Sequence, residues 1–500
     1  IFQDCEPVLC VASSGEQVRK LRALQAQCPS IRGVLVMDAT PLQQPFEQAW
    51  LQAVGQGRSL LLQLQEPAQR RLQELHSTDT ATLIYTSGTT GEPKGVMLSH
   101  ENFLSNVKAC LKAIPIGAND RHLSFLPLSH VFERMAGWYL MMSVGASVAY
   151  AENMESIPQN MLEVKPTVML GVPRFFEKLY TRIQEGLRQA PPLKRRIMEW
   201  ALAVGQRSMA YRFTRRRLPL GLWLQEVLAS RLVFRKIQHR LGGRLRFFIS
   251  GSAPLAKTIG EFFYSLGVTI LEGYGLTETS PVITVNRPQA LKFGTVGLLI
   301  EGAEVLIAQD GEILTQGPHV MQGYYRKPEQ TREVLGDGWF HTGDIGGFDA
   351  EGFLSITDRK KDLIKTAGGK FVAPQKLEQR FITDPYISQA FIYGDLRPYC
   401  VALIVPNLQR VTDYAKTHGL SFASFRELLH APAIHQMLWE RVQALQQDLA
   451  SFEQVKAIAL LEQEFTQAAG ELTPTLKAKR TAIAARYEET LHRLYSTPHG

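Results

Sequence analysis

Residues 84–95 read IYTSGTTGEPKG, a stretch of hydroxyl side chains and glycines that ends with one lysine, Lys94. Its hydroxyls and bare amides suit a small anion better than a hydrophobic core. The preceding ATLIY (81–85) is prone to form a strand, and SHENFLSNVKACLKAI (99–114) has helical apolar spacing. A strand, a glycine-rich loop and a helix in this order present backbone N–H groups to phosphate. The stretch therefore predicts a phosphate-binding loop, although solvated loops have a similar composition.

The loop does not follow the pattern of ordinary P-loop nucleotidases. That pattern requires Gly-x4-Gly-Lys-Ser/Thr, whereas the chain runs from Gly88 to Pro93, Lys94 and Gly95. We expect a phosphate cradle of another kind.

Composition predicts a multidomain intracellular protein. The chain has 500 residues, of which 45% are hydrophobic, enough for more than one core. Its five cysteines form no CxxC pair, which favours a reducing compartment and argues against a zinc site. No signal peptide or apolar run of membrane-spanning length is visible, and residues 135–151 are predicted as a buried helix leading into a strand. We expect a cytoplasmic location, with peripheral membrane contact as a further possibility.

The net charge of +8 is concentrated in one segment. Residues 188–246 contain 15 Lys and Arg against two Glu, a net +13, so the rest of the chain carries −5. A solvated helical face, an anionic membrane surface and an acidic partner protein each explain this block. Nucleic acid is disfavoured because no recognised nucleic-acid motif accompanies the charge.

The order of elements predicts an α/β fold. Strand and helix patterns alternate from residue 7 to about 274, which is typical of parallel sheets covered by helices on both faces. Short strands with glycine turns follow, and residues 302–318 indicate hairpins. The tail mixes strands with long helical stretches. We place the main boundary near DRKKD (358–362), a charged stretch without periodicity.

Four further motifs occur in order after the glycine-rich loop: LEGYGLTETSP (271–281), DGWFHTGDIG (337–346), ITDRKKDLIKTAGGKFVAPQKLE (356–378) and LTPTLKAKR (472–480). Together with that loop they resemble the acyl-adenylate-forming (AMP-binding) superfamily. FLPLSHVFERMAGWYLMM (125–142) is similar to its long-chain fatty acyl-CoA synthetase branch. The resemblance covers the chain from about residue 80 onward.

The resemblance implies a domain plan. We expect a large N-terminal domain (1–357) of helix-covered parallel sheets with a small β-barrel-like part. A hinge (358–362) and a smaller, mobile α+β C-terminal domain (363–500) would follow. The family carries more chain before residue 81 than is present here, so we also expect the N-terminal domain to be truncated.

The resemblance also implies a two-step reaction with ATP and CoA as substrates and Mg²⁺ as cofactor. A carboxylate attacks the α-phosphate of ATP to give acyl-AMP and pyrophosphate, and a thiol then converts acyl-AMP to a thioester. The site must bind charge and hold the reacting groups in line. Its expected nucleotide-binding residues are Thr86, Ser87, Gly88, Thr89, Thr90, Gly91, Lys94, Ser252, Ala253, Gly273, Tyr274, Gly275, Thr277, Asp344 and Arg359.

Individual roles follow from the same resemblance. Tyr274 would lie against the adenine, Thr277 would reach the α-phosphate, and Glu278 would hold Mg²⁺. Asp344 and Arg359 are assigned to the ribose hydroxyls. The predicted acyl pocket comprises His130, Val131 and Val172, although His130 can equally be a structural residue.

Lys477 is the predicted catalytic lysine. Family members carry a lysine near the C-terminus that stabilises the transferring α-phosphate during adenylation. Lys479 also lies in the motif, but the spacing of Lys477 to Arg480 matches the family better. The hinge residue maps to Lys361, and Gly368 and Gly369 would form the thiol channel after a domain rotation.

Three functions are compatible with these features. The first is a long-chain fatty acid–CoA ligase. An adenylating enzyme that loads an acyl carrier protein is the second, since the basic segment could dock an acidic carrier. The third is a non-catalytic acyl- or nucleotide-binding homologue, which the intact set of polar site residues disfavours.

Overall fold

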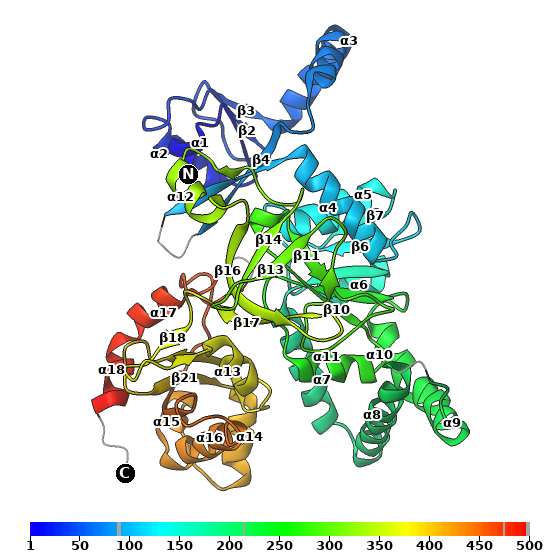
Figure 1. Cartoon of the computed structure of the whole chain (residues 1–500), viewed down its shortest axis with the longest axis vertical. Coiled ribbons are helices and arrows are strands. Elements are labelled where there is room, and N and C mark those ends of the chain that lie inside the picture. The colour runs from blue at the N-terminus through cyan, green and yellow to red at the C-terminus, as the bar shows by residue number, and fades with distance from the viewer. Residues whose placement is uncertain (88–91, 214–215, 474–475, 497–500) are drawn as a thin grey trace. The chain divides into compact units, whose positions relative to one another are not determined.

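The computed structural model describes residues 1–87, 92–213, 216–473 and 476–496 (Figure 1). Contacts divide the chain into two compact units. One comprises Ile1–Leu104 and Val320–Asp337, and the other Ser105–His319 and Gly338–Gly500. None of the described helices combines the length and apolar content needed to cross a bilayer.

The first unit begins with a small parallel sheet. Strands β1 (Leu9–Ala12), β2 (Gly33–Val36) and β3 (Glu47–Ala49) lie in this order, and helix α2 (Gly15–Leu24) packs Val18 and Leu21 against them. This confirms the strand–helix–strand unit expected from the alternating pattern. Helix α1 (Phe2–Cys5) precedes the sheet, and the long helix α3 (Trp50–Glu74) buries none of its residues.

The described parts of the glycine-rich stretch belong to two paired strands, so the expected strand–loop–helix order is wrong. Strand β4 (Thr80–Ser87) pairs antiparallel with β5 (Pro93–Ser99), and α4 (His100–Ala113) begins only after β5. Val96 and Leu98 are both fully buried, and this two-residue spacing makes the segment a strand. Strand β15 (Gly323–Tyr324), followed by α12 (Pro328–Leu335), completes this sheet beside β5. Residues 88–91 lie outside the described part of the chain.

A seven-stranded sheet forms the centre of the second unit. Its order is β12-β11-β10-β9-β8-β6-β7, with β10, β9, β8, β6 and β7 parallel. Every residue of β8 and β9 is buried, as expected for central strands covered on both faces. The bounds are β6 (Arg121–Ser124), β7 (Ser147–Tyr150), β8 (Val168–Gly171), β9 (Phe247–Ser250), β10 (Ile270–Gly275), β11 (Val282–Val285) and β12 (Leu298–Leu299).

Helices pack a hydrophobic core with a cluster of aromatic rings against this sheet. Phe176 of α7 makes edge-on ring contacts with Phe248 of β9 at 5.3 Å and with Phe263 of α11 at 6.4 Å. The helical segments are η1 (Glu133–Tyr139), α5 (Leu140–Ser143), α6 (Ile157–Val164), α7 (Pro173–Arg188), α8 (Pro192–Phe213), α9 (Leu220–Ala229), η2 (Ser230–Phe234), α10 (Arg235–Arg240) and α11 (Lys257–Ser265). The expected buried helix and strand over residues 135–151 correspond to η1, α5 and β7.

A four-stranded antiparallel sheet follows in the same unit, in the order β13-β14-β16-β17. The expected hairpin over residues 302–318 is confirmed, since Glu304 pairs with Gln316 and Ile307 with Ile313. The strands are β13 (Glu304–Ile307), β14 (Glu312–Gln316), β16 (Phe340–Phe348) and β17 (Leu354–Arg359).

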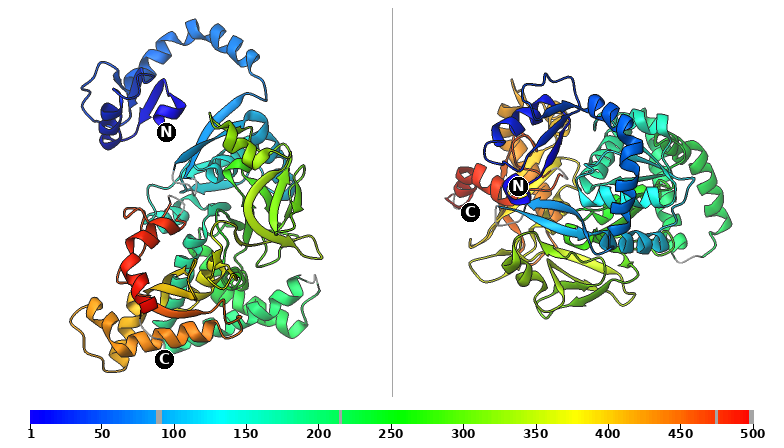
Figure 2. Two further views of the ribbon diagram at one scale, coloured as in Figure 1. Left: turned by 60° about the vertical axis from the view of Figure 1, so that its left-hand side comes forward. Right: turned by 90° about the horizontal axis from the view of Figure 1, so that it is seen from above.

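The C-terminal region is built on a sheet with both faces covered (Figure 2). In β21, Cys400, Ala402 and Ile404 face one core, and Val401, Leu403 and Val405 face another. Helices α13 to α16 cover the first face, and α17 and α18 the second. The bounds are β18 (Ile364–Lys365), β19 (Phe371–Val372), α13 (Pro374–Phe381), β20 (Ile387–Tyr393), β21 (Cys400–Pro406), α14 (Leu408–Thr417), α15 (Phe425–His430), α16 (Pro432–Leu445), β22 (Val455–Leu460), α17 (Arg480–Arg486) and α18 (Glu488–Ser496).

Candidate active site

Several predicted site residues of the second unit lie at or after the carboxyl ends of neighbouring parallel strands. His130 and Val131 come after β6, Val172 directly follows β8, Ser252 follows β9, and Tyr274 is the last residue but one of β10. Carboxyl ends of parallel strands meet at one edge of a sheet, where open α/β sheets bind their ligands. The topology therefore brings residues from four separate sequence segments to one edge.

Two features at this edge require glycine or a strained backbone. A Cβ on Gly275 would lie 1.7 Å from the carbonyl oxygen of Pro281, so no side chain fits there. Ser252 has a left-handed φ of 72°, and such strain in a non-glycine residue is common at binding sites. The hydroxyls of Ser250 and Ser252 are buried without a hydrogen-bond partner among the described residues. These two hydroxyls are therefore available to a polar ligand.

A tyrosine, an aspartate and an arginine connect this edge to the antiparallel sheet. The Tyr274 hydroxyl donates to Asp344 Oδ2 at 2.8 Å, and Arg359 Nε donates to Asp344 Oδ1 at 3.0 Å. Asp344 and Arg359 are direct partners in the β16–β17 ladder. Burial, and then the charge of Asp344, hold the pKa of Tyr274 well above its ordinary value, so it stays a hydrogen-bond donor.

Lys477 lies within electrostatic reach of this group. It is exposed to solvent, yet the protein around it desolvates the ammonium, and together with the charge of Arg359 this lowers the Lys477 pKa to about 8. Asp344 and Glu278 act in the opposite direction. The predicted residues from β10, β16, β17 and the C-terminal segment thus share one electrostatic environment.

We expect adenylation to weaken as the pH rises above about 8. The ammonium form of Lys477 falls tenfold per pH unit beyond its pKa, and with it the positive charge available to the site. Glu272 also titrates near 8, so Lys477→Arg separates the two groups. The guanidinium of arginine stays charged at alkaline pH. The adenylation rate that this variant retains should therefore fall less with rising pH than the rate of the wild type. An unchanged alkaline limb would assign the titration to another group.

Hydrogen bonds and an ion pair hold the segment that carries Lys477. The N–H of Thr473 donates to the Lys477 carbonyl at 2.8 Å, and Leu472 forms a β-bridge with Ala478. Three residues after Lys477, the Arg480 guanidinium pairs with Glu378 at 2.8 Å and lies 4.6 Å from the ring centre of Phe391. Arg480 therefore fastens the lysine segment to α13 and β20.

Arg480→Met is expected to lower the free energy of unfolding by about 3 kcal/mol, because Glu378 remains buried without its cation. The double variant Arg480→Met/Glu378→Gln should recover much of this loss, since glutamine keeps the acceptor for the Ile392 N–H. Urea unfolding of the single and double variants measures the coupling. Additive effects would show that the pair does not fasten the segment.

The three predicted acyl-pocket residues differ in accessibility. Val131 and Val172 are almost fully buried, at 1% and 2% exposure, and His130 is half-buried. Burial, and then the nearby charge of Lys477, lower the His130 pKa to about 4, so this imidazole is neutral at physiological pH. The ring of Phe132 lies 3.0 Å from where a Cβ on Gly251 would be. The start of η1 therefore packs closely against the end of β9.

Among the described residues, no cluster of three or more His, Cys, Asp or Glu could hold a metal ion by itself. Glu278 lies in the short helix η3 (Thr277–Thr279) directly after β10. Magnesium in nucleotide sites is commonly held by one or two carboxylates together with substrate phosphates. A single carboxylate at this edge therefore fits such an ion.

Thr86, Ser87 and Lys94 belong to the first unit. Thr86 and Lys94 pair across the β4–β5 hairpin of the first unit, and the Lys94 ammonium is 4.9 Å from the Tyr324 ring centre. The backbone of Ser87 ends β4, and Gly88, Thr89, Thr90 and Gly91 lie outside the described residues. Gly273 is in β10, and half-buried Ala253 follows Ser252.

The hinge and channel residues are on exposed turns. Lys361 directly follows the turn residue Lys360, just past the end of β17. Gly368 and Gly369 lie between β18 and β19, and a Cβ on Gly369 would meet nothing within 4 Å. The structure thus leaves open space beside Gly369.

Sequence reasoning missed two buried carboxyl groups. Glu272, one residue before Gly273, accepts a hydrogen bond from the Leu255 N–H at 3.3 Å, and burial raises its pKa to about 8. Asp358, just before Arg359, accepts from the N–H groups of Arg359 and Gln375, and burial raises its pKa to about 7. Both adjoin motif residues, but their burial depends on tertiary packing.

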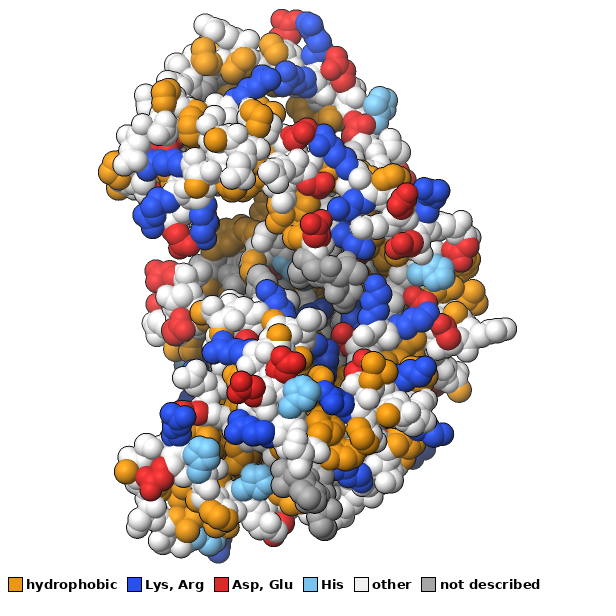
Figure 3. All heavy atoms as spheres, turned by 90° about the vertical axis from the view of Figure 1, so that its left-hand side faces the viewer, with side chains coloured by type: hydrophobic (Ala, Val, Ile, Leu, Met, Phe, Trp, Pro, Cys, Tyr) orange, Lys and Arg blue, Asp and Glu red, His pale blue; other side chains and the backbone are white. Residues whose placement is uncertain are grey.

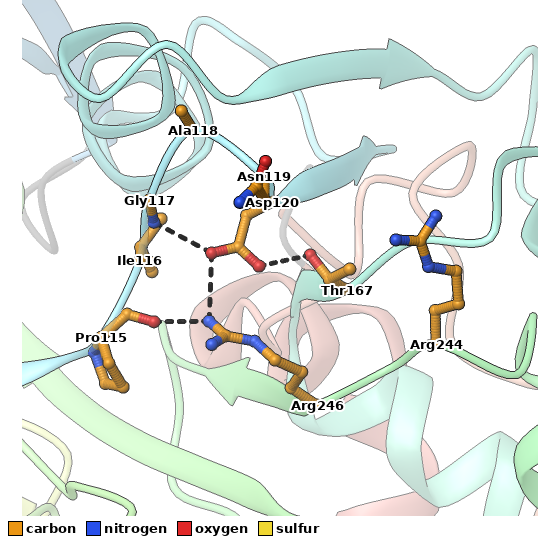
Figure 4. A pocket seen from close by; sticks show the side chains of 9 residues that line it. All are labelled: Pro115, Ile116, Gly117, Ala118, Asn119, Asp120, Thr167, Arg244 and Arg246. Atoms are coloured by element: carbon orange, nitrogen blue, oxygen red, sulfur yellow. Dashed lines mark hydrogen bonds and ion pairs between the residues drawn. The ribbon is translucent and has the colours of Figure 1, made fainter.

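A cavity of about 660 Å³ lies at the opposite edge of the seven-stranded sheet (Figure 4). Its lining residues precede β6, β8 and β9, so it opens at their amino ends. There Asp120 accepts hydrogen bonds from Thr167 and Gly117 and pairs with Arg246 at 3.1 Å, while Arg244 points away. These contacts tie strand starts together, and the cavity is separate from the candidate site.

Two family models match this chain. Residues 1–325 match the family model described as AMP-binding enzyme, and residues 361–499 match the AMP-binding enzyme C-terminal domain. The chain belongs to the AMP-binding enzyme family.

Curated relatives are similar over nearly the whole chain. The Mycobacterium bovis protein named long-chain-fatty-acid–CoA ligase FadD15 is 36% identical over 515 aligned positions, covering 99% of this chain and 81% of that protein. Long chain acyl-CoA synthetase 7, peroxisomal, of Arabidopsis thaliana is 32% identical, covering 98% and 71%. The adenylation domain of a carboxylate reductase from Mycobacterium chelonae has a similar fold. Its TM-score is 0.72 at 24% identity, and the match covers 99% of this chain and 74% of that one.

Proposed function

We propose that this protein is an AMP-forming long-chain fatty acid–CoA ligase. The observation that carries the proposal is the group formed by Glu278, Asp344, Arg359 and Lys477, which come from four separate segments. The relatives named as long-chain fatty acid–CoA ligases and acyl-CoA synthetases support the substrate class.

In the first step a carboxylate oxygen attacks the α-phosphorus of ATP. A new O–P bond forms, the bond to the bridging oxygen of the β-phosphate breaks, and pyrophosphate leaves. Both reactants are anionic, so a cation at the transferring phosphate contributes strongly to stabilising the transition state. Lys477 supplies that charge in this proposal, and Thr277 adds a hydroxyl beside the α-phosphate.

The nucleoside is held by the groups at the strand ends. Tyr274 packs against the adenine, and Asp344, fixed by Tyr274 and Arg359, accepts from the ribose hydroxyls. Ser252 and Ala253 line the adenine pocket. The hydroxyls of Ser250 and Ser252, which have no hydrogen-bond partner among the described residues, and the buried Glu272 carboxyl give this pocket its polar groups.

Glu278 would hold Mg²⁺ beside the phosphates, where the ion supplies charge neutralisation when bound. The segment from Thr86 to Gly91 would wrap the β- and γ-phosphates with hydroxyls and amides, and Lys94 would add a point charge. His130, Val131 and Val172 line the acyl pocket in this proposal. The neutral state of His130 suits an apolar chain better than an imidazolium would.

The second step needs a different arrangement of the C-terminal region. The thiol sulfur attacks the acyl carbon, the C–O bond to AMP breaks, and the thiol proton passes to solvent. Lys477 leaves the site as residues 363–500 rotate about 358–362, with Lys361 as the hinge, relative to residues 1–357. Gly368 and Gly369 then form the thiol channel. The contacts to be broken include the hydrogen bond from Arg174 to the Ser388 carbonyl at 2.7 Å.

Thioester assays test the acceptor. Purified protein is given ATP, Mg²⁺, a long-chain fatty acid and either CoA or an acyl carrier protein with its phosphopantetheine arm. The proposal expects acyl-CoA and AMP in equal amounts. Thioester on the carrier alone would favour carrier-protein loading, and no product with either thiol would favour a non-catalytic homologue.

We also propose a cytoplasmic location, based on the scattered cysteines. Peripheral contact with an anionic membrane or with an acyl carrier protein, through the basic residues 188–246, is compatible with this location.

A further inference from the structure

Helix α9 (Leu220–Ala229) exposes a row of large apolar side chains. Leu220, Trp223, Leu224 and Leu228 are 72%, 50%, 55% and 49% exposed. Their spacing of three and four residues places them on one face of the helix. We call these four residues the α9 stripe.

The other side of α9 is already packed. Ala229 is fully buried, and Leu222 packs against the core of the seven-stranded sheet. Gln225 accepts from Arg207 of α8 at 2.8 Å, and Glu226 pairs with Arg212 of the same helix. The helix is therefore anchored to its unit through residues outside the α9 stripe. An exposed apolar row of this kind marks an interaction site.

Cations surround the stripe at both ends. Arg216 and Arg217 precede α9, and Arg231, Arg235 and Lys236 follow it, all exposed. None of these five has an acidic partner among the residues that the structure describes, and the only acid of α9, Glu226, is paired with Arg212. The stripe is thus flanked by net positive charge, whereas the face drawn in Figure 3 carries basic and acidic side chains interspersed.

We propose that the α9 stripe and its flanking cations dock the protein on an anionic lipid bilayer surface. Leucines and a tryptophan beside arginines match an interfacial helix, in which apolar side chains enter the acyl boundary and cations contact lipid phosphates. An acidic protein would satisfy the cations but leave the leucines without an apolar phase. A ligase for long-chain acids also draws on a substrate that partitions into bilayers, and only this last point rests on the proposed function.

The test uses the whole protein and sedimentation with two kinds of vesicle. One contains equal parts of phosphatidylcholine and phosphatidylglycerol, and the other phosphatidylcholine alone. We expect binding to the anionic vesicles, weakened by salt, and at least about tenfold weaker binding for Leu224→Glu/Leu228→Glu. The matched control is Leu51→Glu/Leu62→Glu, which changes two exposed leucines of α3 and should bind like the wild type.

Tryptophan fluorescence gives a second readout that does not depend on affinity. Brominated lipids should quench part of the emission of the wild type, and Trp223→Phe should remove that part, since Trp223 would lie at the lipid boundary. Circular dichroism and fatty-acid-dependent AMP formation verify that each variant is folded. If the wild type bound anionic vesicles but formed no acyl-CoA, this would count against the proposed function and not against the docking proposal. Two results would overturn the docking proposal: no binding of the wild type to anionic vesicles, or equal binding of the wild type and the stripe variant. A third would be that the protein binds an acidic carrier protein instead of vesicles, and that the stripe variant loses this binding.

Discussion

Lys477→Ala is expected to reduce acyl-AMP formation by about 100- to 1000-fold, the usual cost of removing one group that stabilises transition-state charge. Thioester formation from preformed acyl-AMP should change by no more than a few-fold, because Lys477 acts only while phosphate is transferred. Pyrophosphate release measures the first half-reaction, and conversion of synthetic acyl-AMP with CoA measures the second.

Lys479→Ala is the matched control. Lys479 is exposed, two residues away, and precedes α17. It should retain both half-reactions, since Lys477 and not Lys479 shares the environment of Arg359 and Asp344. Equal loss of both half-reactions in Lys477→Ala, or a larger loss in Lys479→Ala, would contradict the assignment.

The second large effect is expected at the hinge. Lys361→Pro should slow thioester formation by about 100-fold or more, because proline fixes φ near −65° and restricts the residue before it. Adenylation should stay within a few-fold of the wild type. In the structure the Lys361 N–H makes no backbone hydrogen bond to a described residue, so proline removes none there. The same two half-reaction assays apply.

Lys361→Ala separates loss of rotation from loss of the side chain. Alanine keeps both dihedral angles free, so this variant should complete both half-reactions. If Lys361→Pro matched the wild type in thioester formation, the rotation would have to occur elsewhere. If Lys361→Pro lowered adenylation as much as thioester formation, the substitution would have disturbed the neighbouring Arg359 and Asp344.

The sequence predicted most of the central sheet because buried parallel strands are continuous apolar runs. The apolar runs TVMLGVP (167–173) and LRFFISG (245–251) contain β8 and β9. Strand β5 was missed because it runs directly into α4, with no break in the sequence between the two. The position of β22 beside β21 could not be predicted, because it depends on tertiary contacts.

The residues of the candidate site could be predicted from family motifs, but not from local sequence patterns. The roles of Tyr274, Asp344 and Lys477 were inferred from a resemblance, since no local rule connects segments so far apart. The structure then places Tyr274, Arg359 and Asp344 within hydrogen-bond distance. The raised pKa of Glu272 could not be predicted, because it results from burial that only the packed fold creates.

ATP–pyrophosphate exchange that depends on fatty acid tests the central claim most directly. The assay supplies ATP, Mg²⁺, labelled pyrophosphate and fatty acids of short, medium and long chain, without CoA. We expect exchange that is greatest with a long-chain acid, is lost in Lys477→Ala and is kept in Lys479→Ala. Folded protein that shows no exchange with any of the acids would contradict the proposed adenylation.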